Sequence, residues 1–140
     1  MKRVTAIGGI FFKSRSPKDL MAWYHEHLGI QPDDWGGKAF EWRERDNPER
    51  IGQTVFSPFK EDTKHFEPAT EPYMFNFHVA DLPALLEQLR REGVQIVGDM
   101  QDSPYGKFGW IMDPEGRKIE LWQPPDAGNP SAASEDVNRP

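Results

Sequence analysis

The chain has 140 residues, enough for one compact domain or two small intertwined modules with a buried core. Its formal net charge of −6 argues against nucleic acid or an anionic membrane as the main partner. The absence of cysteine excludes disulfides and zinc–thiolate sites, and no apolar run is long enough to span a membrane, so we expect a cytoplasmic protein.

The first half of the chain predicts one helix among strands. Thr5 to Lys13 reads as a strand, and Ser16 followed by Pro17 marks the start of a helix that ends at Gly29. Two further strand-like segments follow, separated by a polar turn that contains proline: residues 38–43 and 52–59.

The second half repeats this order. Tyr73 to Val79 predicts a strand, Asp81 a helix cap, and Gly93 the helix end. Three more strands are predicted, the last two separated by an Asp-Pro-Glu-Gly turn: residues 94–97, 107–112 and 118–123.

These two halves form an internal repeat, because Ser16 aligns with Asp81 and Pro58 with Pro124. Each copy is read as β-α-β-β-β, and the second strand of the first copy is only weakly marked, around residues 30–35. The prediction is an α+β fold of two modules joined by a linker and followed by a disordered tail. The predicted segments are 1–59, 60–72, 73–124 and 125–140, in that order.

Two motifs stand out: residues 23–29 (WYHEHLG), an aromatic-Tyr…Leu-Gly helix end, and residues 113–122 (DPEGRKIELW), a turn followed by Ile-Glu-Leu. Both resemble motifs of the vicinal oxygen chelate superfamily, the glyoxalase and bleomycin-resistance group that includes extradiol dioxygenases. The second of that family's motifs is Asp-Pro-(Asp/Glu)-Gly-Asn-x-Ile-Glu-Leu. Arg117 stands where that family usually has asparagine, so the turn is expected to be stabilised differently. The resemblance implies paired modules whose curled, mixed sheets form a cup-like half-barrel around a ligand, and a homodimer. Activities in that family include lyases, epimerases and dioxygenases, usually on a divalent metal, whereas other members bind drugs without metal or chemistry.

The family's metal positions are poorly provided with ligands here. Counting from the helix caps and the repeat places them at Gly9, Thr54, Met74 and Glu120. Glycine has no side chain, a neutral hydroxyl is a weak ligand, and a thioether prefers soft metals. A catalytic metal needs about three protein ligands, so no metal and no other cofactor is expected. The alternative is a divalent metal whose sole family ligand is Glu120.

Strand parity predicts an aromatic cup with a few polar groups. Phe40 and Phe108 are expected to join it. The predicted ligand-pocket residues are Phe11, Lys13, Trp42, Phe56, Met74, Asn76, His78, Trp110 and Trp122. This lining suits a small aromatic or amphipathic molecule. Histidines 25, 27 and 65 are read as polar-pocket or surface residues, the last of them in the linker.

Three functions remain open. The first is metal-free binding of a small molecule, and the second is a glyoxalase-like lyase or isomerase with Glu120 as general base. The third is an interaction module whose cup is filled by its own side chains. Ring-cleaving dioxygenase chemistry is disfavoured, because it needs iron held by two histidines and a carboxylate, and Gly9 and Met74 occupy the histidine positions. The ligand's identity and any catalysis stay undetermined by the sequence.

Overall fold

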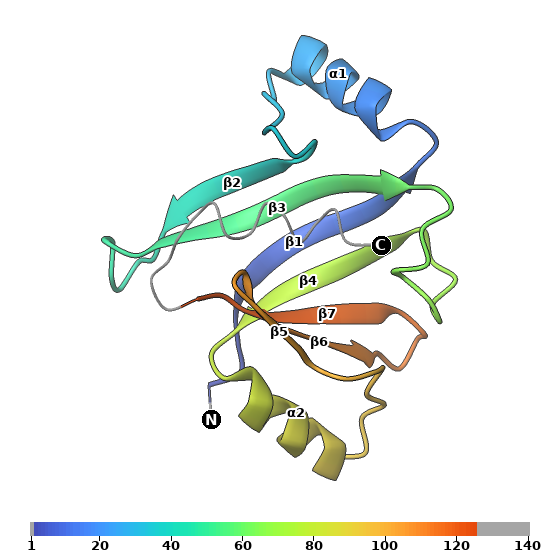
Figure 1. Cartoon of the computed structure of the whole chain (residues 1–140). Helices are drawn as coiled ribbons and strands as arrows, with labels where there is room; N and C mark the ends of the chain where they lie inside the picture. The colour runs from blue at the N-terminus through green and yellow to red at the C-terminus, as the bar shows by residue number, and fades with distance from the viewer. Residues whose placement is uncertain (1, 126–140) are drawn as a thin grey trace.

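The computed structural model describes residues 2–125, which form one open, seven-stranded mixed sheet with two helices (Figure 1). The predicted α+β class is confirmed, and the strand order is β2-β3-β1-β4-β7-β6-β5. Apart from Pro125, the predicted disordered tail lies outside the described residues. The elements are β1 (Val4–Ser14), α1 (Pro17–Leu28), β2 (Lys38–Arg43), β3 (Ile51–Lys60), β4 (Tyr73–Val79), α2 (Leu82–Arg91), β5 (Gln101–Ser103), β6 (Gly106–Met112) and β7 (Lys118–Gln123).

The sheet consists of two halves joined edge to edge. In each half the first strand lies parallel to the last, β1 to β3 and β4 to β7, with the intervening helix as the crossover. The halves meet where β1 pairs antiparallel with β4, for example at Gly9 and Asn76. The two modules of the repeat therefore pair within one chain. The sequence did not decide between this arrangement and pairing across two chains.

The two predicted helix starts and ends are confirmed. α1 begins at Pro17, and it ends at Gly29, whose φ of 70° is the left-handed conformation that glycine adopts at low cost. α2 is capped by Asp81, whose side chain accepts a hydrogen bond from the Ala84 N–H at 3.2 Å. Among the described residues no helix is long and apolar enough to cross a membrane.

Two of the predicted strands were wrong. Residues 94–97 form only an isolated bridge, Ile96 to Ile111, and the edge strand is instead the short β5. Residues 30–35 form a loop in which the Asp33 carboxylate accepts a hydrogen bond from the Ala39 N–H at 2.8 Å. The first half therefore forms two strands after its helix where the repeat predicts three.

The turn before β7 is held by its own side chains. Asp113 Oδ1 accepts hydrogen bonds from the backbone N–H groups of Glu115 and Arg117, at 2.8 and 2.9 Å. The Arg117 guanidinium donates to the Tyr73 hydroxyl at 3.0 Å and to the Glu115 carboxylate at 3.0 Å. Arginine thus ties the turn to the start of β4, the different stabilisation that its presence in the motif predicts.

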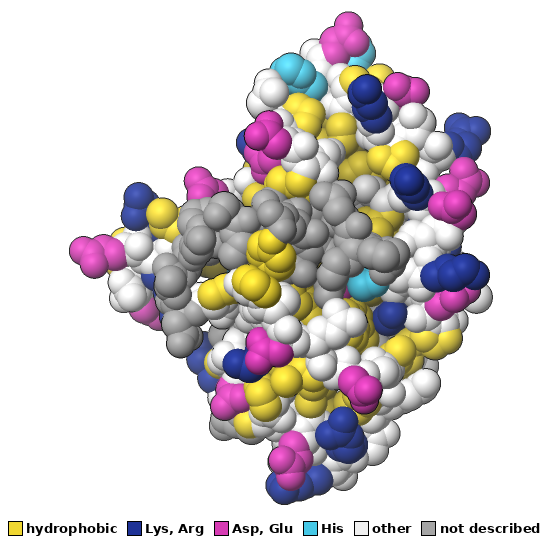
Figure 2. Space-filling view, in the orientation of Figure 1, with side chains coloured by type: hydrophobic (Ala, Val, Ile, Leu, Met, Phe, Trp, Pro, Cys, Tyr) yellow, Lys and Arg dark blue, Asp and Glu magenta, His cyan; other side chains and the backbone are white. Residues whose placement is uncertain are grey.

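Apolar side chains pack on both faces of the sheet. One cluster lies between α2 and the second half of the sheet and contains Leu82, Leu85 and Leu121. The opposite face carries a mainly aromatic cluster, which includes Phe66 from the segment between β3 and β4. By contrast α1 leaves Trp23 and Leu28 exposed, and the space-filling view shows apolar side chains at the surface over this helix (Figure 2).

Candidate functional site

Glu120 lies at the centre of the aromatic cluster, where three strands bring its partners together. It pairs with Asn76 across β4 and β7, and with Trp110 across β6 and β7. Asn76 Nδ2 donates to Oε1 at 2.7 Å, and Trp110 Nε1 donates to Oε2 at 2.8 Å. With 2% of its surface exposed, the carboxylate is enclosed, and these N–H donors compensate for its lost water.

His65 completes this cluster from the linker. Its Nε2 lies 3.0 Å from Glu120 Oε2, and its ring stacks on Phe59 at a centroid distance of 5.7 Å. The Lys118 ammonium donates to the His65 main-chain carbonyl at 2.6 Å and holds the loop in place. Of the two readings that the sequence left open for this histidine, a polar pocket or the surface, the structure shows the enclosed one. The one sequence feature that indicated burial of this segment was Phe66, the aromatic residue next to His65 in a mostly polar linker.

Linker residues fill the interior that the sequence assigned to a ligand. Phe66 is 1% exposed, and its ring lies 5.3 Å from that of Phe59. Lys13 lies at the same end, with Nζ 5.9 Å from the centroid of the Phe66 ring. A filled interior is the feature expected of an interaction module. It also means that a ligand site has to be sought outside this interior.

The observed strand register shows which residue of the first half is equivalent to Glu120, and it corrects the predicted one. In the second half Asn76 pairs with Glu120, and in the first half the equivalent Phe11 pairs with Ser57. Ser57, rather than Thr54, therefore occupies the fourth metal position. The Thr54 hydroxyl instead donates to the Ile7 carbonyl at 2.8 Å.

The residues at these positions do not fit the family's metal. Gly9, Ser57 and Met74 supply no strong ligand for a hard divalent ion, as the sequence already indicated for Gly9 and Met74. Asn76 and Trp110 direct N–H groups at the carboxylate, and such donors would repel a cation. Within residues 2–125 no group of three or more His, Cys, Asp or Glu side chains could hold a metal ion.

A pocket of about 510 Å³ opens at the end of the sheet where β2, β4 and β7 finish. We call it the end pocket. The rings of Trp42, His78 and Trp122 line it, with centroid distances of 5.9 Å between the first two and 4.8 Å between the last two. Trp42 Nε1 donates to Thr54 and Trp122 Nε1 to the Tyr105 carbonyl, both at 2.9 Å. The volume is within the usual range for small-molecule sites, roughly 300–1,000 Å³.

Beside this pocket, two buried polar atoms have no hydrogen-bond partner among residues 2–125, Asn76 Oδ1 and His78 Nε2. Both side chains lie over Gly8, where a Cβ atom would collide with Asn76 Oδ1 and the His78 ring. Burial lowers the pKa of His78 to about 4; Arg50 also lowers it, and the Gln53 main chain partly opposes the shift. At neutral pH the pocket therefore presents an uncharged imidazole.

The structure divides the predicted pocket residues among several places. Trp42, His78 and Trp122 line the end pocket, and Trp122 also belongs to the aromatic cluster. Phe11, Met74, Asn76 and Trp110 are buried in or beside the aromatic cluster, and Lys13 lies near the linker.

Placing Phe56 in the cup was wrong. Its ring packs against Phe12 and Tyr24, at 5.0 and 5.3 Å, on the α1 side of the sheet. Phe40, which pairs with Thr54 in β2–β3, is 43% exposed and does not join the aromatic cluster. The inward residues of β3 are instead Val55 and Phe59.

Comparison with known proteins identifies the fold. A family model described as Glyoxalase/Bleomycin resistance protein/Dioxygenase superfamily matches residues 13–121. No curated protein matches the sequence.

Solved structures share the architecture at low identity. A methylmalonyl-CoA epimerase from Mycobacterium tuberculosis is 20% identical, with a TM-score of 0.57 over 89% of this chain and 91% of that one. A Streptomyces coelicolor methylmalonyl-CoA epimerase variant in complex with 2-nitronate-propionyl-CoA is 17% identical, with a TM-score of 0.62 over 86% and 98%. An NAD-dependent benzaldehyde dehydrogenase from Legionella pneumophila is 12% identical, with a TM-score of 0.55 over 84% and 98%. At such identities the similarity establishes the fold alone.

Proposed function

We propose that this chain, which belongs to the glyoxalase, bleomycin resistance protein and dioxygenase superfamily, binds a small aromatic or amphipathic molecule without the family metal. The observation that carries the proposal is the end pocket, whose wall is formed by Trp42, His78 and Trp122. A flat ligand placed against these rings would replace water with aromatic contacts.

The two unpartnered polar atoms support a site for a ligand that also carries polar groups. A buried acceptor or donor without a partner costs free energy, and a ligand group that bonded to it would recover part of that cost. His78 lines the pocket itself, and the Asn76 side chain lies beside it over Gly8. The pocket therefore combines apolar surface with a polar group that can orient a ligand.

An enzyme with Glu120 as general base is supported less well. The carboxylate is almost fully buried and bonded to Asn76, Trp110 and His65. A substrate could approach it only after the linker loop had moved. The methylmalonyl-CoA epimerases among the similar structures do not alter this, because identity of 20% or less carries no activity to this chain. Binding without turnover is therefore the proposal.

The tryptophan indole N–H signals in a ¹H–¹⁵N NMR spectrum test the proposal directly. Titration with 2-naphthalenemethanol or 2-naphthoate is expected to shift the Trp42 and Trp122 signals saturably, with a Kd on the order of 0.1 mM for at least one probe. Trp23, which is 51% exposed on α1, is the internal reference and should not move.

A matched pair of variants locates the binding. Trp42→Ala is expected to raise the Kd of the more tightly bound probe about tenfold, because it removes one ring from the pocket wall. Trp23→Ala removes the same ring from α1 and should leave the affinity unchanged. The proposal fails if neither probe shifts Trp42 and Trp122, or if all indole signals shift together.

A further inference from the structure

The rim of the end pocket is richer in cations than the molecule around it. Among residues 2–125, four basic side chains contribute to its lining, Lys2, Arg43, Arg45 and Arg50, against two acidic ones. The chain as a whole carries a net charge of −6. A local excess of positive charge on an acidic protein attracts anions to this opening and repels cations from it.

Among these basic residues, Arg50 is the one linked to the aromatic wall of the pocket. It lines the pocket together with His78, and its charge contributes to lowering the pKa of that imidazole. Its Nε lies 3.4 Å from a Glu44 carboxylate oxygen, and both side chains are partly exposed. Such a surface ion pair is worth little, so it can be rearranged around an incoming anion at low cost.

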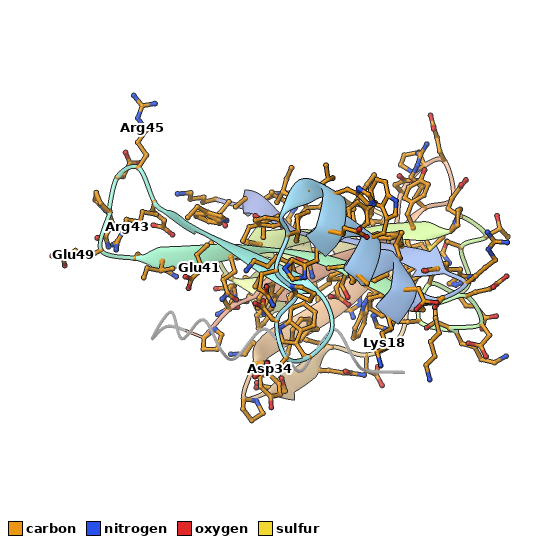
Figure 3. The ribbon with its side chains drawn as sticks, turned by 90° about the horizontal axis from the view of Figure 1, so that it is seen from above. Lys18, Asp34, Glu41, Arg43, Arg45 and Glu49 are labelled. Atoms are coloured by element: carbon orange, nitrogen blue, oxygen red, sulfur yellow. The ribbon has the colours of Figure 1, made fainter. Side chains whose placement is uncertain are left out.

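The other two arginines are placed differently on the hairpin between β2 and β3. Arg43 donates to the Pro48 carbonyl at 2.8 Å, which engages its guanidinium in holding the turn. Arg45 extends from the tip of the hairpin, away from the body of the sheet (Figure 3). Arg50 is therefore the arginine best placed to meet a ligand that already contacts the aromatic wall.

We infer that the end pocket selects an organic anion, a planar aromatic body that carries a carboxylate, with its charge bound by Arg50. This rests on the proposed function, because it assigns a ligand class to the same pocket. An arginine fork matches the geometry of a carboxylate, and the rings of Trp42 and Trp122 lie where the aromatic body would follow.

Two probes of equal shape and different charge test the inference. At about 25 mM salt we expect 2-naphthoate to bind about tenfold more tightly than neutral 2-naphthalenemethanol, measured by the shifts of the Trp42 and Trp122 indole signals. Raising the salt to about 200 mM should reduce this preference by a factor of roughly three, because screening weakens an exposed charge pair.

Arg50→Gln is expected to abolish most of the preference, because it removes the charge that binds the carboxylate. Arg15→Gln makes the same change of charge after the far end of β1, about 30 Å from the pocket by strand rise, and should keep the preference. Equal binding of both probes, or a preference that survives Arg50→Gln, would overturn the inference and leave the proposed pocket intact. Absence of binding by either probe would instead count against the pocket itself.

Discussion

Phe66→Ala is expected to lower the free energy of unfolding by about 3–5 kcal/mol, the usual cost of removing a buried aromatic ring. Phe66 is 1% exposed and packs against Phe59 in the aromatic cluster, although it belongs to the linker between the halves. Its loss would open a cavity beside His65 and loosen the segment that encloses Glu120. Urea unfolding monitored by circular dichroism measures the change.

Phe40→Ala is the matched control, because Phe40 is 43% exposed on β2. It should cost less than about 1 kcal/mol. A loss at Phe66 as small as that at Phe40 would mean that the linker does not fill the cup, and the ligand would then have access to the interior.

Glu120→Ala is expected to destabilise the fold by about 3–5 kcal/mol, comparable to the loss of one partner from a buried charged pair. The change leaves the donors of Asn76 and Trp110 without their acceptor and removes the partner of His65. Equilibrium unfolding in urea, at a pH where the wild type is stable, gives the difference.

Glu120→Gln is expected to cost much less, about 1–2 kcal/mol. The glutamine oxygen can continue to accept from Trp110 and His65. Its amide can donate to Asn76 once the Asn76 side chain has rotated, because Asn76 Oδ1 has no partner at present. If Gln and Ala were equally destabilising, the hydrogen bonds around Glu120 would not be the reason for its burial.

The halves of the fold could be predicted because their signals are local. Strand bounds at residues 38–43, 73–79 and 118–123 match the structure, since each strand is bounded by turn residues or a helix cap. Asp81 likewise caps its helix through a contact within one turn. The inward positions of Asn76, His78 and Glu120 followed from a strand period that no bulge in β4 or β7 interrupts.

The face of β3 could not be predicted in the same way. Aligning Pro58 with Pro124 displaced the first-half strand by three residues relative to the observed register, which places Ser57 opposite Phe11. An odd displacement exchanges the two faces of a strand, so Phe56 was assigned to the cup in error. Register between distant strands depends on packing that no local pattern records.

Neither the burial of linker residues in the aromatic cluster nor the end pocket could be predicted, for a similar reason. Residues 60–72 are mostly polar, and only the folded chain brings His65 to Glu120, a separation of 55 positions. The end pocket combines the ends of several strands with the hairpin of residues 44–50. Its lining residues lie in different segments of the sequence, so their proximity is a property of the sheet order.

The most direct test of whether the protein's own donors hold Glu120 is a measurement of bound metal. Tag-free wild-type protein and Glu120→Gln would be incubated with Zn, Mn, Fe or Ni, desalted and analysed by plasma mass spectrometry. With Asn76, Trp110 and His65 bonded to the carboxylate, we predict less than about 0.1 metal ion per chain for each metal in both proteins. About one ion per chain in the wild type, lost in Glu120→Gln, would contradict the account and make a metal-dependent enzyme the leading hypothesis.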